Sequence, residues 1–182
     1  MSGYTRLDQV TTADCVRALA AHQSYCATVA PLRIMDQLRG LAELDLGLPC
    51  SQLQHSLMTA TLARKAGVDD ETLVVALCHD LGKTLSVPNH AAIGAEILKP
   101  YVSENHYQAV LHHQEFQGRY YYGHIGQPTD LREAYRGEPW YALAEALVDE
   151  WDMPAFDPDF IADPLESFEP AVIKIFSAPR YI

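Results

Sequence analysis

Hydrophobic positions recur along this chain at helical spacing, and no segment shows the alternation expected of a half-buried strand. The ends of the predicted helices coincide with prolines, with glycines such as Gly67, and with capping residues such as Ser51. The pattern therefore predicts an all-α protein. Its helices are expected over residues 12–29, 31–46, 51–67, 69–82, 89–100, 103–113, 139–152 and 165–177.

Residues 114–129 interrupt this pattern. They lack apolar periodicity and contain Gly118, Gly123, Gly126 and Pro128 around a run of three tyrosines. We expect a long tyrosine-rich loop here, and loops of that length often carry function.

Length and charge narrow the class of protein. The 182 residues contain no repeat or linker, which predicts a single domain over residues 1–182, and a hydrophobic content of 48% suffices for a core. A net charge of −11 argues against binding to nucleic acid or to an anionic membrane surface. The longest apolar run, Leu73 to Cys78, is too short to span a bilayer, and the four cysteines form no CxxC pair. We expect a cytoplasmic protein with reduced thiols, of unknown oligomeric state.

The most informative segment is the predicted helix over 69–82, where the apolar run leads directly into His79 and Asp80. A carboxylate at the end of a buried helix is costly unless it is paired or bound to metal. Adjacent helical residues point about 100° apart, so His79 and Asp80 cannot coordinate one ion in the way that residues i and i+4 on one helix face can. The two side chains can converge on a cluster at the helix end, where the two oxygens of Asp80 could bridge two ions.

Other predicted helices supply the remaining ligands of such a cluster. For two of these ligands the sequence leaves alternatives open: Asp149 in place of Asp152, and His112 in place of the adjacent His113. Imidazole and carboxylate without thiolate suit iron, manganese, magnesium or zinc in a catalytic role. The candidates are His55, His90, His112, His113 and Asp152.

The order of these residues resembles the HD-domain superfamily of metal-dependent enzymes, through His55, His79-Asp80 and Asp152. With His90 and His113 added, it is similar to the dinuclear branch. Residues 52–57 (QLQHSL) resemble 2-amino-1-hydroxyethylphosphonate dioxygenase. Residues 55–60 (HSLMTA) and 79–84 (HDLGKT) resemble myo-inositol oxygenase. Both relatives are mixed-valent di-iron oxygenases on an HD scaffold.

The resemblance covers residues 50–152 as a metal-binding core, with residues 1–45 as an N-terminal helical extension. It implies that Asp80 bridges two ions, with His55, His79 and Asp152 on one, and His90 with His113 or His112 on the other. The implied cofactor is an Fe2+/Fe3+ pair, with Mn2+, Mg2+ or Zn2+ as alternatives. Lys83 stands where the inositol enzyme has a substrate-binding lysine, which gives it a catalytic role beside Asp80.

The function that follows is an oxygenase that uses O2 to cleave or hydroxylate a small polar substrate, hydroxylated or phosphonate-like. The alternative is a phosphohydrolase acting on a phosphate ester or nucleotide, because hydrolases of the superfamily often share the His-Asp-x-Gly-Lys motif around Lys83. A third reading is a non-catalytic binding module.

Two further features concern the substrate. Arg119 and the three tyrosines at positions 120–122 either pack the tyrosine-rich loop or form a lid. In the lid, Arg119 and Tyr120 are the expected substrate contacts, by an arginine fork to an anion and a tyrosine hydrogen bond. The phosphonate enzyme has a capping tyrosine and glutamate whose equivalents here lie near Asp45 and Leu48. This chain therefore lacks that device, which puts the same substrate in doubt.

Overall fold

The computed structural model describes residues 3–181, and every regular element within them is a helix. This confirms the predicted all-α class. No helix in this part of the chain is both long enough and apolar enough to cross a bilayer. The α-helices are α1 (Thr12–Thr28), α2 (Ala30–Gly40), α3 (Gln52–Lys65), α4 (Asp70–Cys78), α5 (His90–Leu98), α6 (Glu104–Leu111), α7 (His113–Tyr121), α8 (Tyr141–Ala146) and α9 (Glu169–Phe176). The short 3-10 helices are η1 (Leu7–Gln9), η2 (Leu41–Glu43), η3 (Leu81–Thr84), η4 (Val87–Asn89), η5 (Tyr122–Ile125), η6 (Leu131–Tyr135) and η8 (Leu165–Phe168), and η7 (Leu147–Asp152) is a π-helix.

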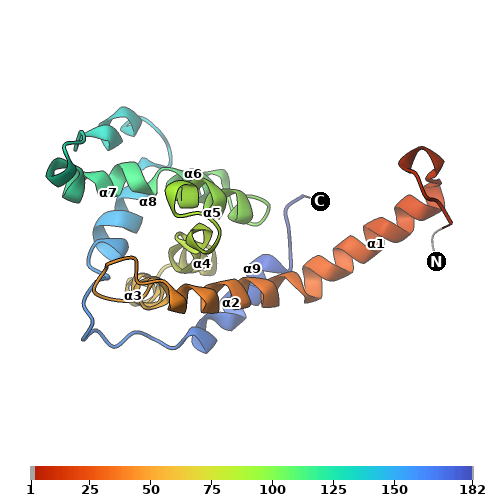
Figure 1. Cartoon of the computed structure of the whole chain (residues 1–182), viewed down its shortest axis with the longest axis horizontal. Coiled ribbons are helices and arrows are strands. Elements are labelled where there is room, and N and C mark those ends of the chain that lie inside the picture. The colour runs from red at the N-terminus through yellow and green to blue at the C-terminus, as the bar shows by residue number, and fades with distance from the viewer. Residues whose placement is uncertain (1–2, 182) are drawn as a thin grey trace.

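Helix α4 lies at the centre of the fold, with α3 and α9 packed against it and α6 on another side (Figure 1). Asp69 begins this helix as a cap, since its carboxylate accepts a hydrogen bond from the Thr72 amide at 2.9 Å. Every residue from Thr72 to Cys78 is buried. A helix that is apolar all round must be enclosed by others, and α4 therefore carries its C-terminal end into the interior.

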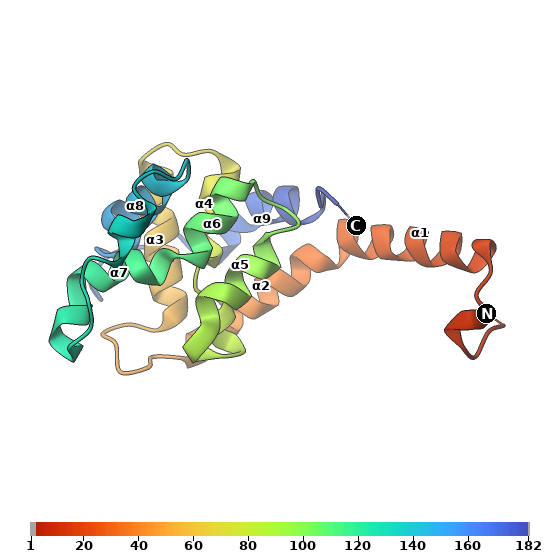
Figure 2. The same ribbon diagram turned by 90° about the horizontal axis from the view of Figure 1, so that it is seen from above.

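Helix α1 extends away from this body and buries none of its residues, as both views show (Figures 1 and 2). A capping box between Thr11 and Asp14 begins it, which is the reason for the abrupt helix start. The adjoining α2 is different, because Met35 and Leu38 lie in the main core. Within residues 1–45, the second half thus contributes to the core.

The chain is irregular where it approaches the end of α4. The expected helix over 69–82 stops at Cys78, and Asp80 has φ −97° and ψ 5°, between the helical and extended regions. Many active-site residues occupy this bridge region. Gly82 then allows η3 to lie against the start of α5: a Cβ at this position would be 2.9 Å from the backbone Cα of His90.

The prediction of a long loop over residues 114–129 is wrong. Residues 113–121 form α7, which follows α6 after a single non-helical residue. Phe116 is the one large apolar side chain that α7 buries, so the segment has no apolar stripe for the sequence to reveal. Gly118 has a packing role, because the Tyr122 ring lies against the space that its Cβ would fill.

The expected helix over 139–152 changes type partway. It is α-helical to Ala146, and Leu147–Asp152 is a π-helix in which the Met153 amide donates to the Val148 carbonyl at 2.8 Å. A π-helical turn inserts an extra residue, and such turns are frequent at functional sites. Here it separates Asp149, which is partly exposed, from Asp152, which is fully buried.

A Gly82→Ala variant tests the close approach of η3 to α5. We expect it to lower the free energy of unfolding by about 1–3 kcal/mol, because the added methyl meets backbone atoms that cannot move aside. Gly137→Ala is the matched control, since its Cβ would meet no atom within 4 Å, and should change stability by less than about 0.5 kcal/mol. Urea denaturation measures both. Equal stability of the two variants would contradict this packing.

Candidate metal centre

Six side chains from five parts of the chain meet in the interior, and all six are buried. Two of them, His79 and Asp80, directly follow α4. The others lie on α3, at the first residues of α5 and α7, and at the last residue of the π-helix. The cluster consists of His55, His79, Asp80, His90, His113 and Asp152.

The Asp80 carboxylate lies between two groups of histidines. Its Oδ2 faces one group, 3.6 Å from His55 Nε2 and 3.5 Å from His79 Nε2. Its Oδ1 faces the other, 3.1 Å from His90 Nε2 and 3.5 Å from His113 Nε2. Asp152 joins the first group, with its Oδ1 3.0 Å from His55 Nε2. The two oxygens of one carboxylate thus serve two separate sets of donor atoms.

The backbone fixes which nitrogen of each imidazole carries the proton. In all four histidines Nδ1 lies within hydrogen-bond distance of a main-chain carbonyl, which can only accept, so the hydrogen sits on Nδ1. In the neutral ring, Nε2 then keeps its lone pair and points into the cluster. The pairs are His55 with Ala155 at 2.9 Å, His79 with Ala76 at 2.9 Å, His90 with Val87 at 2.8 Å and His113 with Val110 at 2.7 Å.

Consequently the centre of the cluster contains acceptors that face each other. Nε2 of His55 and of His79 are 3.3 Å apart, as are those of His90 and His113. Two lone pairs at this distance form no hydrogen bond. Asp80 Oδ1 and Asp152 Oδ1 are buried without a hydrogen-bond donor. Such an arrangement is unfavourable unless positive charge lies between the atoms.

Metal ions fit this arrangement. Ligands about 2.1 Å from an ion and at right angles to each other lie about 3 Å apart, close to the separations found here. Two triads of side chains each bring their donor atoms within 4.8 Å of one another: His55, His79 and Asp152, and His79, Asp80 and His113. The carbonyl behind each imidazole is also the partner that metal-binding histidines usually have. These residues could hold a pair of ions.

Electrostatics in the cluster favour ionised carboxylates. Burial would raise the pKa of Asp80, but protonated imidazoles, His79 foremost, and the Lys83 ammonium hold it well below its usual value. Burial would lower the pKa of His55 and of His113, but the carboxylates Asp152 and Asp80 outweigh it and raise both, so protons compete with metal ions for these two rings. Burial lowers the pKa of His79 to about 4, against the pull of the two carboxylates, so this ring is neutral and free to act as a ligand at neutral pH.

Three polar side chains surround the cluster. Lys83 Nζ donates to Asp80 Oδ2 at 2.5 Å and to Gln52 Oε1 at 2.7 Å. Gln117 Nε2 donates to Asp152 Oδ2 at 2.5 Å. The sequence analysis identified Lys83 but missed both glutamines. The only sequence signal for Gln52 was its place one turn before His55, and nothing distinguished Gln117.

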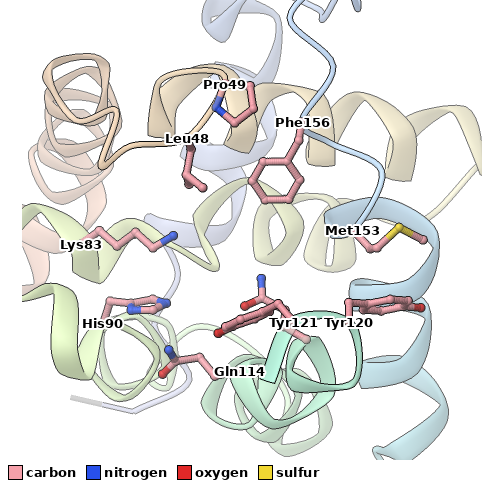
Figure 3. Close-up of a pocket in the computed structure, with 10 residues that line it drawn as sticks. Leu48, Pro49, Lys83, His90, Gln114, Tyr120, Tyr121, Met153 and Phe156 are labelled. Atoms are coloured by element: carbon pink, nitrogen blue, oxygen red, sulfur yellow. The ribbon is translucent and has the colours of Figure 1, made fainter. Parts of the chain in front are cut away.

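A cavity of about 560 Å³ adjoins the cluster on the side of His90 and Lys83 (Figure 3). Tyr121 directs its hydroxyl towards these two residues, whereas the Tyr120 hydroxyl points the other way. Burial raises the pKa of Tyr121 to about 12, so it meets a ligand as a neutral hydroxyl. The lining residues are Leu48, Pro49, Lys83, His90, Gln114, Gln117, Tyr120, Tyr121, Met153 and Phe156.

The structure places the alternative ligands differently. His112 stacks on Trp140 outside the cluster, with ring centroids 5.0 Å apart and planes at 12°, whereas His113 lies within the cluster. Asp149 likewise lies outside, because both its oxygens accept from Arg132 Nη1, at 2.9 and 3.0 Å.

Of the two expected substrate contacts in the tyrosine-rich segment, Tyr120 borders the cavity and Arg119 does not. Arg119 is exposed on α7 and does not line the cavity. Tyr120 lines it, but its hydroxyl points out of it. Because the segment is a helix, successive side chains diverge by about 100°, and it is Tyr121 that reaches inward.

Comparison with protein families identifies the chain's family. The HD domain family matches residues 53–152, which is more than half of the chain and includes all six residues of the cluster. No curated protein shows significant similarity to the chain.

Matched substitutions of neighbouring residues test the ligand set. We expect His113→Gln and Asp152→Asn each to weaken the affinity for metal by at least about tenfold, because each removes a donor from the cluster. The purified variants should therefore contain less metal. His112→Gln and Asp149→Asn, one and three residues away, should keep the full metal content. Metal analysis after gel filtration measures all four. Loss of metal in the control variants, with retention in the cluster variants, would show that the ligands have been misassigned.

Proposed function

Because the chain belongs to the HD domain family, we propose that it is a dinuclear metalloenzyme in which Asp80 bridges two ions. His55, His79 and Asp152 complete one side of the centre, and His90 and His113 the other. The observation that carries this proposal is the convergence of four imidazole lone pairs on buried carboxylates that have oxygens without a donor. The ammonium of Lys83 reaches only Asp80 Oδ2, so it does not neutralise Asp80 Oδ1 or Asp152 Oδ1, which have no donor.

Of the reactions open to such a centre, we favour oxygenation of a small hydroxylated substrate. The support comes from the motifs around His55 and His79, which resemble those of two di-iron oxygenases. The cavity is compatible with such a substrate, because it adjoins the cluster and apolar side chains line much of it. A mixed-valent iron pair, when bound, would supply O2 activation and chelation of the substrate hydroxyl.

The chain's own residues orient the substrate against this centre. Lys83 lies between the cavity and Asp80, so its ammonium can attract an anionic or hydroxyl oxygen at the mouth of the cluster. Tyr121 offers a neutral hydroxyl from the opposite helix. Gln117 holds Asp152 by the oxygen that faces away from His55, and so keeps the other oxygen directed at the centre.

Phosphate ester hydrolysis is the second candidate, and the position of Lys83 favours it as well. An ammonium beside a dinuclear centre suits a phosphate group, and the same two ions could generate hydroxide and clamp the ester. The substrate would then be a phosphate ester or nucleotide, and neither O2 nor a redox-active metal would be required.

Metal content and oxygen consumption separate the two reactions. We expect the purified chain to bind about two iron ions and to consume O2 with its substrate, as a dinuclear oxygenase would. Asp80→Ala should lose both ions and the activity together, because one carboxylate serves both sites. Activity with Mn2+ or Mg2+ under anaerobic conditions, measured on phosphate esters, would instead establish the hydrolase.

Replacing Lys83 separates substrate binding from metal binding. Lys83→Ala should keep the metal and reduce kcat/KM by about 10- to 100-fold, mainly through KM, because a charged hydrogen bond to the substrate is lost. Lys174→Ala is the control, since that lysine pairs with Asp70 on the exposed surface. Steady-state kinetics with parallel metal analysis measures both. An unchanged KM in the Lys83 variant would exclude the proposed substrate contact.

A further inference from the structure

The cavity beside the cluster has two chemically different sides (Figure 3). Leu48 and Pro49, from the segment before α3, lie on one side together with Met153 and Phe156, which follow the π-helix. Polar side chains lie across from them. These are Lys83, His90, Gln114 and Tyr121.

Charge on the polar side is limited to one group. Among the lining residues, all within the described part of the chain, Lys83 is the only lysine or arginine. A nucleotide or polyphosphate usually requires several cationic groups or backbone amides around its phosphates. One ammonium beside a metal centre is suited to a single small anionic or hydroxylated head.

The apolar side is exposed to solvent although it is held in place. Leu48 and Met153 keep 39% and 40% of their surface accessible. The Leu48 turn is anchored, since its amide donates to the Asp45 carbonyl at 2.9 Å, and Leu46 adopts a left-handed φ of 53°. Backbone strain of this kind persists where the surrounding structure fixes it, often beside ligands.

These observations extend the proposed function, on which the inference rests. We propose that the substrate is amphipathic, with one anionic, hydroxyl-bearing head at Lys83 and the metal centre and an apolar chain or ring against Leu48, Met153 and Phe156. A fully hydroxylated molecule would place hydroxyl groups against these apolar side chains, where the hydroxyl groups would lose their hydration without gaining hydrogen bonds. A volume of about 560 Å³ falls in the range of small-molecule sites.

Binding of 2-hydroxy acids of increasing chain length tests the inference. The full chain is loaded with iron, its metal content is measured, and affinities are obtained anaerobically by calorimetry, so that no turnover is needed. From 2-hydroxypropanoate to 2-hydroxyoctanoate we expect affinity to rise about three- to fourfold per added methylene. Gluconate, of the same length as 2-hydroxyhexanoate but polyhydroxylated, should bind more weakly than that acid.

Two variants locate the effect. Leu48→Gln and Met153→Gln, which lie in separate segments, should each weaken the affinity for 2-hydroxyoctanoate by about fivefold or more. The affinity for 2-hydroxypropanoate should change by less than about twofold. Leu46→Gln is the control, because its side chain lies in the same turn but does not line the cavity, and it should bind the whole series as the parent does.

The outcomes distinguish this inference from the proposed function. A chain without bound metal would overturn the proposed function, and the inference with it. A metal-loaded chain whose affinity is independent of chain length, or that binds gluconate or adenosine monophosphate more tightly than 2-hydroxyhexanoate, would overturn the inference alone. Chain-length dependence that persists unchanged in both glutamine variants would also overturn it.

Discussion

The structure depends on the charge balance at the end of α4, where Asp80 is fully buried and four histidines, in their neutral form, direct Nε2 lone pairs towards the cluster. Four main-chain carbonyls impose this orientation, since each fixes the proton of one histidine on the far side of its ring. A second carboxylate, Asp152, adds negative charge to the same centre. Cations between these atoms would convert a mutually repelling set of acceptors into a set of ligands.

The departures from regular helix explain how five segments deliver side chains to one point. Helix α4 ends before His79 and Asp80, which allows both side chains to turn inward, and Gly82 allows α5 to begin close enough to bring His90 in. The π-helical turn places Asp152 inside and leaves Asp149 to pair with Arg132. Helix α4 therefore carries the site into the interior, and the interruptions of regular helix determine where its side chains point.

Much of this centre could be predicted from the sequence, because its signals are local. An apolar run ending in His-Asp predicts a buried carboxylate, and His55, His90 and Asp152 follow at the ends or faces of recognisable helices. The choice of His113 over His112 required the structure, since it depends on the direction in which α7 leaves α6. Gln52 and Gln117 escaped prediction for a similar reason, and Tyr121 was predicted only as one of three lid tyrosines. Helix α7 buries a single large apolar residue, and its helical character rests on tertiary contacts that no periodicity records.

The central claim is that Asp80 bridges two metal ions, and anomalous scattering from crystals of the iron-loaded chain tests it most directly. The account predicts two peaks in the anomalous difference map at the iron edge, one on each side of the Asp80 carboxylate. One peak would lie among His55, His79 and Asp152, and the other beside His90 and His113. A map without anomalous peaks at the cluster, or with one ion that leaves an Asp80 oxygen bound only to Lys83, would contradict it.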